Sequence, residues 1–152
     1  MSLDASREQD LDTLEDELRR AQRITPDLVA KVIDRTCRAQ HPTGKAAILR
    51  LIDSGAFVES ALAVLELEWP SWKVRRLAQD DGEWRCSLSR QLALPAELDV
   101  IAEASHEILP LAILNAFVET RRTAFAANGL VPKTVPRVRR AYGCVACCDN
   151  FR

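Results

Sequence analysis

Glycine and proline are scarce in this chain, and their scarcity excludes whole classes of protein. The 152 residues include only five Gly and seven Pro, whereas 47% are hydrophobic and 28% are charged. Collagen-like and Pro/Gly-rich disordered chains have a very different composition. A chain of this length buries about two thirds of its unfolded surface on folding, so we expect one globular domain with an ordinary core.

Cysteine is also scarce, and the five residues form an odd number. The first ten residues, MSLDASREQD, are polar and acidic, where a secretory signal needs a basic end followed by an apolar run. The longest uncharged stretch, residues 108–118, is far shorter than the ~20 residues of a membrane-spanning helix. These absences predict a cytoplasmic protein with free thiols, no disulfide framework and no membrane association.

Neither sign of charge dominates. The formal net charge is -1 at pH 7, so no overall field draws the protein to nucleic acid or to an anionic membrane. The charges are segregated, however. The stretch DASREQDLDTLEDE is acidic, and the segment PKTVPRVRRAYG is basic through Lys133, Arg137, Arg139 and Arg140. This segment suits nucleic acid, lipid head groups, an acidic partner, the acidic N-terminal helix or simple solvation as a tail.

The acidic stretch also has helical periodicity. Leu11, Leu14 and Leu18 recur at spacings of three and four among charged residues, which predicts a helix over residues 4–23 with one narrow apolar stripe. Because the stripe must be covered, the helix needs a partner helix. The three leucines are therefore candidates for an interaction surface.

Further helix signals follow. Thr25 is a suitable N-cap and Pro26 suits the first helical position, so a second helix is expected to begin there. The next helical stretch breaks or bends at Gly55 and stops at Pro70.

The pattern then changes to alternation. A β-hairpin is predicted by the apolar residues that alternate on both sides of the turn signal DDG, namely Trp72, Val74, Trp84, Cys86 and Leu88. Leu77 breaks this alternation, so we expect a β-bulge near Arg75 and Arg76. Residues 99–105 fit either a third strand or a helical turn, and we prefer the strand.

The strongest helix signal comes after His106. Residues 108–118 are apolar nearly all round the predicted helix, which indicates burial against a sheet and against either other helices or a second subunit. Helices must also cover the ribbon, because two strands alone are marginally stable. The fold class is therefore α+β, with N-terminal helices, a small antiparallel sheet of two or three strands, and a long buried helix packed on it.

The C-terminal GCVACC cluster raises the question of a metal site. Cys144 and Cys147 have the spacing of two ligands of a tetrahedral zinc, but a structural site needs four. Cys37 and His41 would supply the other two if the tail folds back across the domain. The alternative is a set of thiols on a lightly docked tail, with no cofactor.

Two other groups have a chemical and a structural interpretation. His106 lies among Glu103, Ser105 and Glu107, so it fits a general base, but capping of the following helix is the simpler role. The tryptophans beside the hairpin arginines fit base stacking, whereas their alternating positions favour the core.

The order of these elements resembles a known type of domain. The helix SALAVLELEW, the strands WKVRRLA and EWRCSLS, and the helix that opens LPLAILNAFVE follow one another between about residues 60 and 122. This order resembles the small α-β-α sandwich domains of phage and prophage proteins. The resemblance implies the fold and a phage-related origin. Those domains have no assigned reaction, so it implies no site residue.

We therefore divide the chain into an N-terminal helix over residues 1–24, which would serve as a partner-facing arm, an α+β domain over residues 25–128, and a basic, cysteine-bearing tail over residues 129–152. We expect a non-catalytic cytoplasmic interaction or accessory module that acts as a homo-oligomer. The helix at residues 108–118 and the leucine stripe motivate this expectation.

Two alternatives stay open. One is a nucleic-acid-associated protein that uses Arg137, Arg139 and Arg140 together with the hairpin arginines. The other is a small metal-binding or thiol-dependent protein that uses the C-terminal cysteines.

Overall fold

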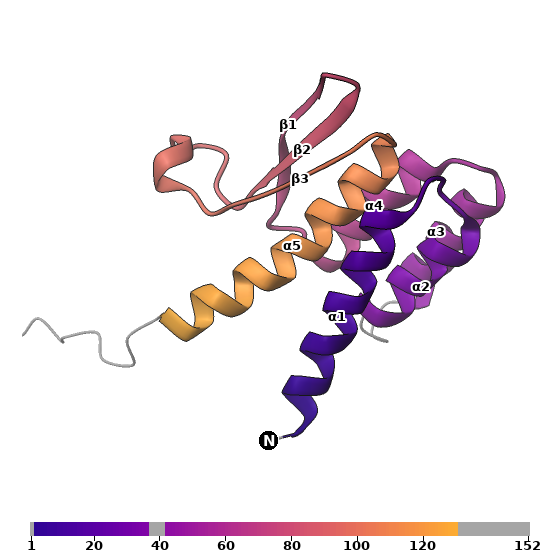
Figure 1. Ribbon diagram of the computed structural model, residues 1–152, viewed down its shortest axis with the longest axis horizontal. Coiled ribbons are helices and arrows are strands. Elements are labelled where there is room, and N and C mark those ends of the chain that lie inside the picture. Colours follow the sequence, from indigo (N-terminus) through magenta and orange to yellow (C-terminus); the bar gives the residue numbers. More distant parts are fainter. Residues whose placement is uncertain (1, 37–41, 131–152) are drawn as a thin grey trace, which may run out of the picture.

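The architecture comes from a computed structural model that describes residues 2–36 and 42–130. Helices cover one face of a small sheet (Figure 1), which confirms the predicted α+β class with a helix packed on the sheet. The elements, in chain order, are α1 Ser2–Arg20, α2 Pro26–Thr36, α3 Pro42–Asp53, α4 Phe57–Glu68, β1 Lys73–Asp80, β2 Glu83–Ser89, the short helix η1 Ala96–Leu98, β3 Ile101–His106 and α5 Leu109–Leu130.

The sheet has three antiparallel strands in the order β1-β2-β3. The turn between β1 and β2 consists of Asp81 and Gly82, whose φ angles are 50° and 87°. Two positive φ angles define a type I′ turn, which matches the twist of a hairpin. The register shifts between Val74 and Arg76, which confirms the predicted bulge and places Leu77 opposite Cys86.

The segment before α5, whose sequence fits either a strand or a helical turn, forms the strand β3. β3 pairs with β2 so that Ala102 lies opposite Leu88 and Ala104 lies opposite Cys86. Small residues on this face of β3 let α5 approach the sheet closely. The preference for a third strand at residues 99–105 is therefore confirmed from Ile101 onward.

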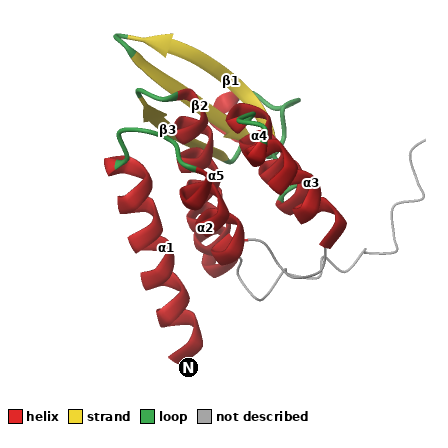
Figure 2. Cartoon of the chain, turned by 90° about the vertical axis from the view of Figure 1, so that its right-hand side faces the viewer, coloured by secondary structure: helices red, strands yellow, loops and turns green. Residues whose placement is uncertain are grey.

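The helix α5 lies at the centre of the fold, with β2 and β3 on one side and α1 and α4 on the others (Figures 1 and 2). Residues 110–118 of this helix are all buried. The elements of a single chain therefore cover the helix that is apolar all round, and its burial needs no second copy.

The leucine stripe of α1 is likewise covered within the chain. Leu14 and Leu18 are both 0% exposed and belong to the main core, where α1 contacts α5 and α2, while Leu11 stays partly exposed. The predicted need for a partner helix holds, but the same chain supplies that partner. The C-terminal half of α1 thus packs on the α+β core.

The local signals for the middle helices are also present in the structure. The backbone N–H of Leu28 donates to Thr25 Oγ1 at 3.2 Å, as expected of an N-cap. α3 and α4 are separated at Gly55, whose φ is 78°. A positive φ favours glycine because it has no Cβ.

The hairpin tryptophans serve the core. Trp72 is 3% exposed, and Trp84 packs against the core from the face of β2 that also carries Cys86 and Leu88. This arrangement confirms the core interpretation and leaves Trp72 inaccessible for stacking on a base. Across the described residues, no helix combines the length and the apolar character needed to cross a membrane.

Candidate functional site

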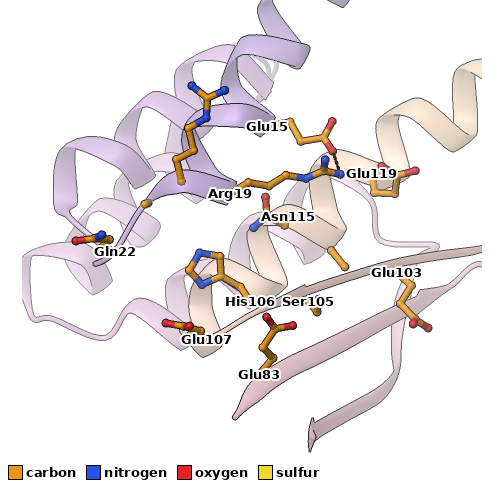
Figure 3. Close-up of a pocket in the computed structure, with 13 residues that line it drawn as sticks. Glu15, Arg19, Gln22, Glu83, Glu103, Ser105, His106, Glu107, Asn115 and Glu119 are labelled. Atoms are coloured by element: carbon orange, nitrogen blue, oxygen red, sulfur yellow. Dashed lines mark ion pairs between the residues drawn. The ribbon is translucent and has the colours of Figure 1, made fainter. Parts of the chain in front are cut away.

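A cavity of about 650 Å³ lies between the C-terminal end of α1, the strand β3 and the helix α5 (Figure 3). This volume lies within the ~300–1,000 Å³ that is usual for binding sites. The residues that line the cavity are mostly charged or polar: Glu15, Arg19, Arg20, Ala21, Gln22, Glu83, Glu103, Ala104, Ser105, His106, Glu107, Asn115 and Glu119.

Asn115 of α5 lies between the fully buried residues Leu114 and Ala116 and is itself only 3% exposed. Within residues 2–36 and 42–130, neither Nδ2 nor Oδ1 of this side chain has a hydrogen-bond partner. In Figure 3 the amide projects from α5 toward Arg19. An unpaired buried polar group costs roughly 1–3 kcal/mol. A leucine at this position would avoid this cost.

The α1 wall of the cavity is held by an ion-pair network. Glu15, whose side chain is 6% exposed, pairs with Arg19 on its own helix and with Arg122 on α5, the latter at 2.7 Å between Oε2 and Nη2. Arg19 extends over Asn115 toward Glu15 (Figure 3), yet its side chain is 62% exposed. Because the Arg19 side chain reaches solvent and Glu15 is also paired with Arg122, Arg19 can move away without leaving the buried carboxylate unpaired.

The β3 wall is the free edge of the sheet. The consecutive residues 103–107 all line the cavity. Side chains alternate between the two faces of a strand, so a surface that touches every residue must run along the strand edge, where the backbone is accessible. β3 is the last strand of the sheet as described, and it lies on the same side of the molecule as α1 (Figure 2). Its outward N–H and C=O groups can therefore pair with an added strand.

His106 is oriented by the backbone. Its Nδ1 accepts a hydrogen bond from the N–H of Ile108 at 3.0 Å, in the turn that precedes α5. A neutral imidazole that accepts through Nδ1 carries its proton on Nε2 and therefore presents a donor at its other ring nitrogen. In the described part of the chain, no hydrogen bond joins His106 to Ser105.

The carboxylates of the cavity fall into two groups. Glu15 is neutralised by its arginines, and Glu103 accepts from Ser87 Oγ at 2.7 Å and pairs with Arg85 at 3.5 Å. The second group has no ion pair with any described residue and consists of Glu83, Glu107 and Glu119. The cavity therefore has a negative potential that the chain itself leaves partly uncompensated.

A separate polar cluster around Asp99 has a structural role. The carboxylate is 0% exposed, accepts hydrogen bonds from Ser89 Oγ and, at 2.9 Å, from the N–H of Gln91, and pairs with Arg75 Nη1 at 3.2 Å. Burial opposes ionisation, but these hydrogen bonds and the charge of Arg75 hold the pKa of Asp99 below its ordinary value. Arg75 therefore uses its guanidinium to hold the loop that follows β2, through Asp99 and the carbonyl of Leu94, and is not available to bind nucleic acid.

Most of the site residues predicted from the sequence are not among the described residues. Cys37, His41, Cys144 and Cys147 fall outside the described residues, as do Arg137, Arg139 and Arg140. Among the residues that are described, no group of three or more His, Cys, Asp or Glu is arranged to hold a metal ion. The zinc site and the basic-segment interface therefore stay predictions.

The sequence reasoning missed Asn115, although a signal for it exists. Asn115 is the one side chain with hydrogen-bonding groups in the uncharged stretch of residues 108–118. A polar residue at the middle of an otherwise apolar helix needs a partner. The sequence therefore marks Asn115 as a polar residue that needs a partner, but it does not predict the cavity beside it.

Comparison with known proteins adds no assignment, because no family model, curated protein or solved structure matches this chain. The resemblance to phage domains thus stays a prediction, and the cavity is interpreted from its own chemistry.

Proposed function

We propose that this protein is a non-catalytic interaction module that holds an extended segment of a partner protein in the cavity along β3. The unpaired, buried amide of Asn115 carries this proposal, because it is a recognition group without a partner in the described chain. The proposal keeps the interaction module expected from the sequence but moves the interaction surface from the leucine stripe to the cavity.

The occupant is an extended peptide because of the strand edge. The cavity follows residues 103–107 of the β3 edge and the turn after it, and an extended chain that pairs there would continue the sheet by one strand. Backbone pairing would supply affinity, while alternate side chains of the peptide would point toward α5. Asn115 and the Nε2–H of His106 lie where such side chains would be recognised.

The proposal does not require a second copy of the chain. Two features suggested a homo-oligomer, the helix at residues 108–118 and the leucine stripe, and both are mostly buried within one chain. A peptide from any protein that presents a free extended segment would fit the same edge.

The first test is the effect of Asn115→Leu on stability. Because the leucine side chain has the same number of heavy atoms, branched at the same carbon, and needs no hydrogen bond, the variant should unfold at a higher urea concentration than the wild type. The matched control is Thr120→Val, since Thr120 is also 0% exposed on α5 but donates to the carbonyl of Phe117 at 2.6 Å. Thr120→Val should not raise the unfolding midpoint.

The second test is peptide binding. Peptides would be selected from a displayed random library on the full chain, and their contact site would be located by backbone amide NMR shifts. We expect shifts at residues 103–107, loss of binding in Asn115→Leu and retention in Thr120→Val. N-methylation of alternate peptide amides should abolish binding, because it removes the donors that pair with β3. The proposal is overturned if no selected peptide moves these resonances, or if Asn115→Leu lowers stability and leaves binding intact.

A further inference from the structure

We infer that the bound segment carries a basic side chain, lysine or arginine, which enters the cavity beside Asn115. The inference rests on the proposed function and specifies its ligand chemistry. Three observations support it. Some carboxylates of the cavity have no ion pair with a described residue, the amide of Asn115 has no hydrogen-bond partner there, and the guanidinium of Arg19 already lies in the cavity.

The carboxylates come from different elements around the cavity. Glu83 begins β2, Glu107 lies in the turn between β3 and α5, and Glu119 lies one helical turn beyond Asn115 on α5. None lies within ion-pair distance of a described basic residue, although the charge of Glu119 also acts on Arg122 and helps to raise the pKa of that guanidinium. A cation at the centre of the cavity would be attracted by all of these carboxylates, whereas an anion would be repelled by each of them.

Asn115 adds a discriminating hydrogen bond. Its Oδ1 is a free acceptor, which a lysine ammonium or an arginine guanidinium can satisfy with an N–H donor. Bonds of this charge-assisted kind are about twice as strong as neutral ones. Its Nδ2 remains available to donate to a carbonyl of the bound peptide, so one ligand can satisfy both halves of the amide.

Arg19 shows that the cavity can hold a guanidinium. Its side chain extends over Asn115 and pairs with the carboxylate of Glu15 (Figure 3). This side chain is mostly exposed, so an incoming arginine or lysine can take its place while Arg19 turns to solvent. Glu15 would keep its pair with Arg122 in either case.

The test uses the full chain with four fluorescent peptides of one length. The first follows residues 131–143 of this chain, VPKTVPRVRRAYG, because it is a basic segment already present in the sequence. The second has the same composition in scrambled order, and the third replaces every Lys and Arg with Gln. The fourth replaces them with Glu. A full-chain variant in which Lys133, Arg137, Arg139 and Arg140 are changed to Ser removes competition from the chain's own basic residues.

We expect the two basic peptides to bind at least about tenfold more tightly than the Gln peptide, and the Glu peptide not to bind. Asn115→Leu should weaken the basic peptides by about tenfold or more. The triple variant Glu83→Gln, Glu107→Gln, Glu119→Gln should reduce their affinity toward that of the Gln peptide and flatten its dependence on salt. Asp53→Asn, at an exposed acidic residue of α3 that does not line this cavity, is the matched control.

The possible failures are distinguishable. Equal binding of the basic and Gln peptides at the β3 resonances would overturn the requirement for a basic side chain and leave the peptide-binding module in place. Preferential binding of basic peptides that the triple variant does not weaken would overturn the cavity as their site. Absence of binding by all four peptides to both full-chain forms, together with an empty library selection, would overturn the proposed function itself.

Discussion

The carboxylate of Glu15 on α1 lies 2.7 Å from Nη2 of Arg122 on α5, and only 6% of the Glu15 side chain is exposed. Arg122 also pairs with Asp12 one turn earlier on α1. This contact joins residues far apart in the sequence and holds α1, which forms one wall of the cavity, against α5. The position of α1 relative to Asn115 thus depends on an ion pair as well as on the leucine core.

Glu15→Gln should lower the free energy of unfolding by about 1–2 kcal/mol, because it leaves Arg122 and Arg19 without a shared buried carboxylate. The measurement is urea unfolding at pH 7. Asp16→Asn is the control, since its pair with Arg20 spans 3.9 Å and both side chains are mostly exposed. That control should change stability by less than about 0.5 kcal/mol, and equal losses at both positions would contradict the role of the network.

Leu14→Ala should destabilise the isolated chain by about 3 kcal/mol, because a fully buried leucine is lost and a cavity remains. Leu11→Ala should cost less than about 1 kcal/mol, since that side chain is already partly exposed. Denaturant unfolding and size-exclusion chromatography would be measured on both variants. If Leu14→Ala left the free energy of unfolding unchanged but altered the oligomeric state, the leucine stripe would instead be a contact between subunits.

The Asp99 carboxylate should make stability depend on pH in acid. Its folded pKa lies below the ordinary value of 3.8, so its contribution is fully present above that value and is lost as the pH falls through the folded pKa. Asp99→Asn should therefore be less stable than wild type at pH 7, and the difference should shrink as the pH is lowered below 3.8. Urea midpoints of both proteins between pH 7 and pH 2 would test this, and a constant difference would contradict it.

The Cys86 thiol should be inert in the folded protein. Burial raises its pKa to about 11, and the negative charge of Glu103 adds to the rise. At pH 8 only about one such thiol in a thousand is ionised. A variant with Cys37, Cys144, Cys147 and Cys148 changed to Ser isolates this group. We expect negligible reaction with a disulfide reagent in buffer and one thiol per chain in denaturant. Rapid stoichiometric labelling of the folded variant would contradict the burial.

Local patterns were sufficient for much of the fold. Thr25 and Pro26 mark a helix start, Gly55 marks a break, and the parity of Leu77 predicts the bulge, because each of these depends on backbone geometry within a few residues. The α+β class follows from the change between helical periodicity and alternation. All of these features are present in the structure.

Long-range packing decided the rest. Periodicity shows that Leu14 and Leu18 form an apolar face, but it does not show whether that face meets the same chain or another, since burial depends on which elements come together. For the same reason the sequence marks Asn115 as an oddity without revealing the cavity beside it. The cavity exists only where α1, β3 and α5 meet, and its walls come from residues that are up to about a hundred positions apart in the chain.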